Sequence, residues 1–104
     1  MTATIQMDKI YAHSENVLEK EIEGLLLIIP LKGGIQDKEN HLPLTETGRA
    51  LWDALDGKRT MREVVAVLAE EFMAGPGEIE RDVFCLMVDF LQREMLVEAS
   101  AAGA

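Results

Sequence analysis

The first regular pattern along the chain is an alternation of apolar and charged residues over 17–22, which is typical of a strand with one solvated face. Glu23-Gly24 follows and supplies a tight turn, because glycine accepts a positive φ at little cost. The apolar run over 25–29 stops at Pro30 and is too short for a helix, which favours a second strand buried on both faces. The sequence therefore predicts a hairpin.

A short third strand is predicted over 42–44, where two leucines flank Pro43. Proline has no N–H to donate, so Pro43 confines this strand to a sheet edge. The glycines and charges of residues 31–40 predict a loop before it. Residues 1–15 show no sustained period, and we expect a flexible, loosely docked arm there and a disordered tail over 99–104.

Two short helices joined by a tight turn follow the third strand. Thr45 can cap a helix that begins at Glu46, and Gly57 suits the left-handed position just past its last turn. Thr60 and Glu63 have the spacing of a capping box at the start of the second helix. In both segments the apolar positions recur three and four residues apart, which indicates one buried face on each helix.

A third helix is predicted from about residue 77 to residue 94, and it carries more apolar positions than one buried stripe needs. One line of these positions consists of Ile79, Val83, Leu86, Met87 and Phe90. A second line consists of Phe84, Val88, Leu91 and Met95. The second line is either additional core, including the core of a homodimer, or an exposed binding surface, and the pattern leaves both open.

Length and charge narrow the range of partners. The chain has 104 residues, which suits one domain, and its 19 acidic against 10 basic residues give a formal net charge of −9. This balance opposes binding to nucleic acid or to an anionic membrane surface. The sequence has one cysteine, no targeting segment and no apolar run near the roughly 20 residues of a membrane span. We therefore expect a soluble protein in the cytoplasm.

The polar residues do not form a pattern that supports catalysis. His13, His41 and Cys85 lack the spacing of zinc ligands, and we predict no metal and no cofactor. Acidic residues at 70–71 and 78–82 have no partner base nearby in the sequence. No catalytic residue, and no enzymatic activity, is predicted.

Residues 16–98 resemble the PqqD-like family. The most specific match is LTETGRALWDALDGKRTMREVVAVLAEEF, residues 44–72, with its central turn at 56–60. Asn16-Val17 followed by Glu21-Ile22, the apolar strand that ends at Pro30, and Asp82-Val83 support it.

The resemblance implies an α+β, winged-helix-like domain over 16–98, with a three-stranded antiparallel N-terminal sheet followed by a three-helix bundle. It also implies a non-catalytic recognition element, or peptide chaperone, that binds the leader of a ribosomally made precursor peptide. Such proteins present that peptide to a modifying enzyme, often a radical S-adenosylmethionine protein, as in the biosynthesis of pyrroloquinoline quinone (PQQ).

In the family the peptide adds as a strand beside the third strand and lies against the last helix, so that main-chain hydrogen bonds supply affinity and side-chain pockets supply selectivity. Carried onto this chain, the expected peptide-binding residues are His41, Leu42, Leu44, Val83, Phe84, Met87, Val88 and Leu91.

Two other classes of function are considered. A winged-helix DNA-binding protein would share the two helices and the tight turn, but acidic residues outnumber basic ones across 78–94, and such a helix would repel phosphates. A structural role, in which the chain forms a homodimer through its third strand or third helix, is the third alternative and is also compatible with the family resemblance.

Overall fold

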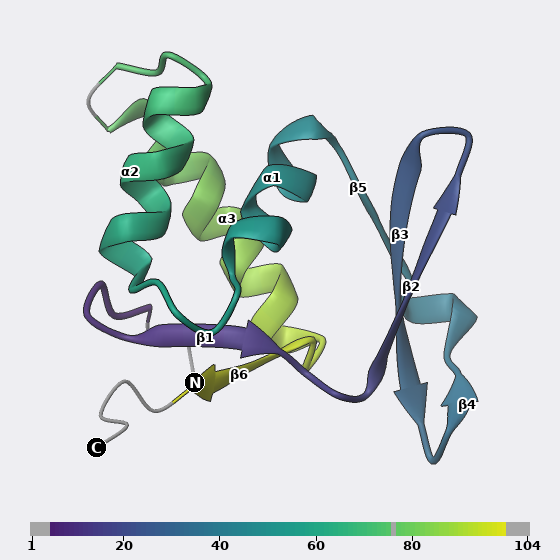
Figure 1. Ribbon diagram of the computed structural model, residues 1–104. Coiled ribbons are helices and arrows are strands. Elements are labelled where there is room, and N and C mark those ends of the chain that lie inside the picture. Colours follow the sequence, from purple (N-terminus) through teal and green to yellow (C-terminus); the bar gives the residue numbers. More distant parts are fainter. Residues whose placement is uncertain (1–4, 76, 100–104) are drawn as a thin grey trace.

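A computed structural model describes residues 5–75 and 77–99 and shows an α+β fold with antiparallel sheets and three helices (Figure 1). The predicted tail lies outside these residues except for Ala99, as do residues 1–4 of the predicted arm. In the described part, no helix is long and apolar enough to cross a membrane.

The main sheet is built on the predicted hairpin. Strands β2 (Val17–Ile22) and β3 (Leu25–Lys32) pair antiparallel, and the turn between them has positive φ at both Glu23 and Gly24, which matches the right-handed twist of a hairpin. On the same sheet, β3 also pairs with the short strands β4 (Ile35–Gln36) and β5 (Leu42–Leu44). A single 3-10 turn, η1 (Lys38–Asn40), connects β4 to β5. The predicted hairpin and third strand are confirmed, but the prediction of a three-stranded sheet is wrong. The main sheet has four strands, because β4 pairs with the end of β3 inside the segment predicted as a loop.

The N-terminal segment differs from its prediction as a loosely docked arm. Strand β1 (Ile10–His13) pairs antiparallel with β6 (Leu96–Ala99), and the side chain of Tyr11 is buried. The His13 ring stacks on Trp52 with centroids 3.8 Å apart. The arm prediction is therefore wrong over β1, because a four-residue strand is too short to show a period and its partner is distant in sequence.

Local sequence signals define the three helices. Helix α1 (Glu46–Ala54) begins after Thr45, whose hydroxyl accepts a hydrogen bond from the Gly48 N–H. Helix α2 (Met61–Glu71) begins with the predicted capping box, in which the Thr60 hydroxyl accepts from the Glu63 N–H and the Glu63 carboxylate accepts from the Thr60 N–H. Helix α3 (Glu78–Gln92) is the longest. Both predicted helix caps are confirmed.

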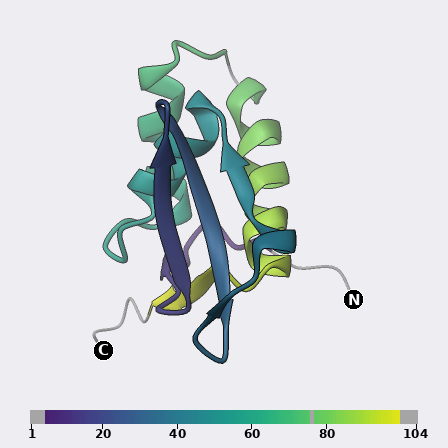
Figure 2. The ribbon, with the colours of Figure 1, turned by 90° about the vertical axis from the view of Figure 1, so that its right-hand side faces the viewer.

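All three helices lie on one face of the main sheet, as the two perpendicular views show (Figures 1 and 2). Leu26, Ile28 and Leu44 point from this inner face into the core, where Trp52 of α1 and Phe90 of α3 meet edge to face. No α-helix in the described part of the chain covers the other face, which we call the outer face, and only β4 and η1 lie along its border near Ile29 (Figure 2). Leu25 of β3 is 42% exposed there, so the prediction that this strand is buried on both faces is wrong at that position.

Candidate functional site

The free edge of β5 is the first element of the candidate site. The register pairs Leu26 with Leu44, Leu27 with Pro43 and Ile28 with Leu42, and no other strand in the described part of the chain pairs with β5. In an antiparallel pair, hydrogen-bonded and non-bonded residue pairs alternate. Because Pro43 has no N–H, the bonded positions are Leu42 and Leu44, and Pro43 turns its nitrogen and carbonyl toward the free edge.

One flank of α3 stands opposite this edge. A Cβ on Gly48, in the first turn of α1, would lie 3.3 Å from Leu44 Cδ2 and 3.6 Å from Leu86 Cδ2. Glycine at this position therefore allows α1, β5 and α3 to approach closely. Farther along α3, Arg93 Nη1 donates a hydrogen bond to the backbone carbonyl of Asn40 at 3.0 Å. These contacts place the flank that carries Leu86 and Arg93 beside β5 and η1.

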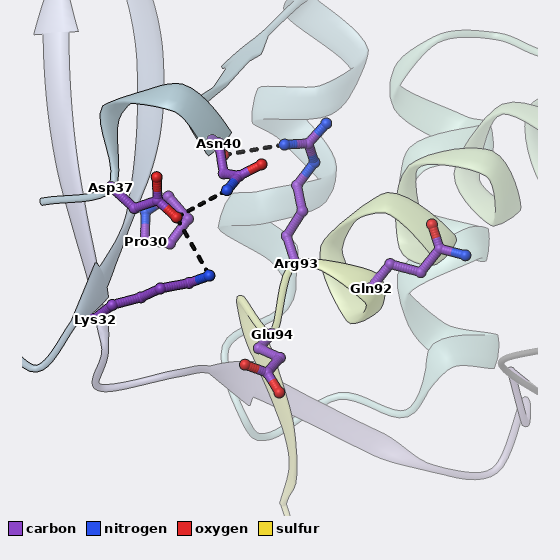
Figure 3. A pocket seen from close by; sticks show the side chains of 7 residues that line it. All are labelled: Pro30, Lys32, Asp37, Asn40, Gln92, Arg93 and Glu94. Carbon is purple, nitrogen blue, oxygen red and sulfur yellow. Dashed lines mark hydrogen bonds and ion pairs between the residues drawn. The ribbon is translucent and has the colours of Figure 1, made fainter.

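A polar pocket of about 140 Å³ lies between η1 and the C-terminal end of α3, next to the start of β5 (Figure 3). Asp37 accepts a hydrogen bond from Asn40 Nδ2 at 2.8 Å and lies 3.4 Å from Lys32 Nζ. The hydrogen bond from Asn40, with the nearby Lys32 ammonium, lowers the pKa of the Asp37 carboxyl below its usual 3.8. The carboxylate therefore stays charged and holds η1 in place next to Arg93.

The predicted site residues separate into three groups. Leu44, Val83 and Met87 are buried in the core, and we leave them out of the candidate surface because they expose almost no side-chain area. Leu42 is half-buried and His41 is exposed, both at β5. The remaining three are half-buried on α3: Phe84, Val88 and Leu91.

Those three residues do not face β5. Successive helical residues are about 100° apart, so Phe84 lies about 200° around the helix from Leu86. Phe84 and Leu91 pack against the core from this opposite flank. The half-buried side chains beside β5 are instead Leu86 and Arg93. The sequence pattern placed Leu86 on the buried line and counted Arg93 only in the charge balance of residues 78–94, although a basic residue after an apolar helix stripe was a visible signal for the site.

Histidine, cysteine and carboxylate side chains are dispersed over the described ranges. No group of three or more His, Cys, Asp or Glu side chains in residues 5–75 and 77–99 is placed to hold a metal ion. His13 donates from Nε2 to the Trp52 carbonyl at 2.7 Å, and His41 donates from Nδ1 to the Lys38 carbonyl at 2.6 Å. The histidines thus have structural partners.

Comparison with protein families decides the relationship of this fold to known proteins. The family model for coenzyme PQQ synthesis protein D (PqqD) matches residues 36–96, which is more than half of the chain. The chain belongs to the PqqD family. The matched segment starts in β4 and ends in β6, so it contains β5 and all three helices and omits the β2–β3 hairpin. No match was found among curated proteins or among solved structures.

Proposed function

We propose that this member of the PqqD family is a non-catalytic module that binds the leader segment of a ribosomally made precursor peptide. The peptide adds as a strand along the free edge of β5, and the module presents it to a modifying enzyme such as a radical S-adenosylmethionine protein. The product of that pathway is PQQ or a related peptide-derived compound. The support is the family membership together with the unpaired edge of β5 beside an apolar helix flank.

The chemistry of the edge fits strand addition. The carbonyl of Pro43 faces away from β3, and the same alternation continued by one step beyond β5 turns the N–H and carbonyl of His41 toward an added peptide backbone. Leu42 and Leu86 supply half-buried apolar contacts on the core side of the added strand. Arg93 at the C-terminal end of α3 offers a guanidinium, which favours a leader with an acidic side chain at that position.

The experiment compares two half-buried aliphatic side chains, Leu86 and Val88, on opposite flanks of α3. The probes are synthetic N-terminal halves of short precursor peptides drawn from the genome that encodes this chain, and calorimetry measures the affinity of each for the unmodified chain, for Leu86→Ala and for Val88→Ala. We expect Leu86→Ala to weaken binding by about 5- to 30-fold, since it removes roughly 1–2 kcal/mol of apolar contact, and Val88→Ala to change it less than about twofold.

Equal effects of the two substitutions would contradict this location of the site. Both side chains are half-buried on the same helix, so the pair controls for general destabilisation, which thermal unfolding measures independently. If no leader peptide binds the unmodified chain, the result would contradict the proposed function itself.

A further inference from the structure

The outer face of the main sheet forms an apolar surface that lies outside the proposed peptide site except at His41, which borders both. The register pairs Leu18 with Ile29, Lys20 with Leu27 and Ile22 with Leu25, so all six side chains share this face. Leu18, Ile22 and Leu25 are 37%, 44% and 42% exposed, whereas Leu27 is half-buried and Ile29 is buried. Figure 2 shows the sheet from this side, with the helices behind it. Contiguous exposed apolar side chains of this kind mark interaction surfaces.

The charge of this surface differs from the charge of the whole chain. A hollow of about 250 Å³ opens on the outer face, and its lining consists of Lys20, Ile22, Leu27, Ile29, Gln36, Lys38 and His41. No carboxylate is among these residues, although acidic residues outnumber basic ones 19 to 10 in the sequence. Alternation along β2 turns Glu19 and Glu21 to the helix side, where Glu21 pairs with Arg49 at 2.6 Å.

We propose that the outer face docks an apolar protein segment bordered by carboxylates. This inference rests on the proposed function, in which the segment belongs to the modifying enzyme. Apolar side chains fill the hollow, and the carboxylates pair with Lys20 and Lys38. A strand added to β5 extends the same sheet, so a protein docked on the outer face also lies beside the bound peptide.

Charge disfavours two other occupants. A two-fold dimer through this face would bring the same lysines of both copies together, because a two-fold interface joins identical patches. An anionic membrane would attract Lys20 and Lys38 but would repel a chain with a net charge of −9. A protein segment with a few carboxylates avoids the first penalty, and because charges more than about 8–10 Å apart are largely screened at physiological salt, such a segment responds to Lys20 and Lys38 more than to the net charge of the chain.

The test uses a synthetic peptide in which leucine and valine alternate with aspartate and glutamate, and a matched peptide with lysine in place of the acidic residues. We follow the amide resonances of the isotopically labelled chain and measure affinity by titration. The acidic peptide is expected to shift resonances of Lys20, Ile22, Leu27 and Lys38 and to bind more weakly as salt is raised. The lysine peptide is expected to leave these resonances unchanged.

Charge-reversal variants sharpen this test. The double substitution Lys20→Glu with Lys38→Glu is expected to weaken binding of the acidic peptide at least about fivefold, since two favourable charge contacts become repulsive. Lys58→Glu, an exposed substitution on the turn between α1 and α2, is the control and should have little effect. Leader binding at β5 should survive the double substitution, whereas Leu86→Ala should weaken leader binding and leave acidic-peptide binding intact.

Four results would overturn the inference. They are equal binding of the lysine peptide, acidic-peptide binding without shifts on the outer face, shifts of these residues with phosphatidylglycerol vesicles in place of peptide, and a concentration-dependent dimer that shifts them. The last two would assign the face to a membrane or to a second copy of the chain.

Discussion

The two faces of the main sheet use the same kinds of side chain in opposite surroundings. On the inner face Ile28 is 0% exposed against the helices, whereas on the outer face Ile22 of the neighbouring strand is 44% exposed. Both are isoleucines in regular antiparallel pairing, in register with leucines. The difference is that helices cover only the inner face (Figure 2). Apolar character in a strand therefore identifies surface that can be buried, but the neighbouring elements decide whether the chain itself buries it.

The same contrast separates two roles. The inner face and the helices form the core that fixes the position of β5, and the free edge of β5 is the proposed peptide site. The outer face contributes little to this core and is the proposed docking surface. Substitutions on the inner face should therefore change stability, and substitutions on the edge or the outer face should change binding.

The largest expected difference is in stability. Ile28→Ala should lower the free energy of unfolding by about 3 kcal/mol, because it removes a fully buried side chain and leaves a cavity. Ile22→Ala makes the same chemical change on the outer face and should lower it by less than about 1 kcal/mol. Urea unfolding, followed by the fluorescence of the buried Trp52, measures both values. Similar losses would show that a further element covers the outer face.

An intermediate effect is expected at the free edge of β5. Pro43→Val and Pro43→Ala both restore an N–H that faces an added strand. One additional hydrogen bond of about 1 kcal/mol should tighten leader-peptide binding about fivefold. The two variants should gain equally, because the N–H and not the side chain is the cause. Unchanged or weaker titration affinity for both would show that the peptide does not pair with this edge.

The smallest expected effect is a change in stability at Asp37, the residue that precedes η1. The pKa of Asp37 is lowered in the folded chain, chiefly by the hydrogen bond from Asn40, so its charged form stabilises the fold above the ordinary value of 3.8. This stabilisation is lost as the pH falls through the lowered pKa. Asp37→Asn should therefore be slightly less stable than the unmodified chain above about pH 5, and the difference should vanish toward pH 2. Urea unfolding across this range would contradict the account if the difference stayed constant.

Local features of the fold could be predicted from the sequence. The Glu23-Gly24 turn and the Thr60–Glu63 capping box depend on residues within four positions of each other, and the structure contains both. The β1–β6 pair could not be predicted, because Tyr11 and Glu98 are partners that lie far apart in sequence and neither strand is long enough to show a period.

The candidate site was only partly predictable for a related reason. Helical spacing correctly grouped Phe84, Val88 and Leu91 on one line, but spacing does not say which flank of a helix faces a sheet. That orientation depends on the close approach at Gly48 and on the Arg93–Asn40 hydrogen bond, which are contacts between distant segments.

Amide hydrogen exchange with and without the leader peptide tests the central claim most directly. If the peptide adds as a strand to β5, exchange of the outward-facing N–H groups of His41 and Thr45 should slow strongly in the complex. The N–H groups of Leu42 and Leu44 already bond to β3 and should change much less. A bound peptide that leaves His41 and Thr45 exchanging at their free rates would contradict strand addition at this edge.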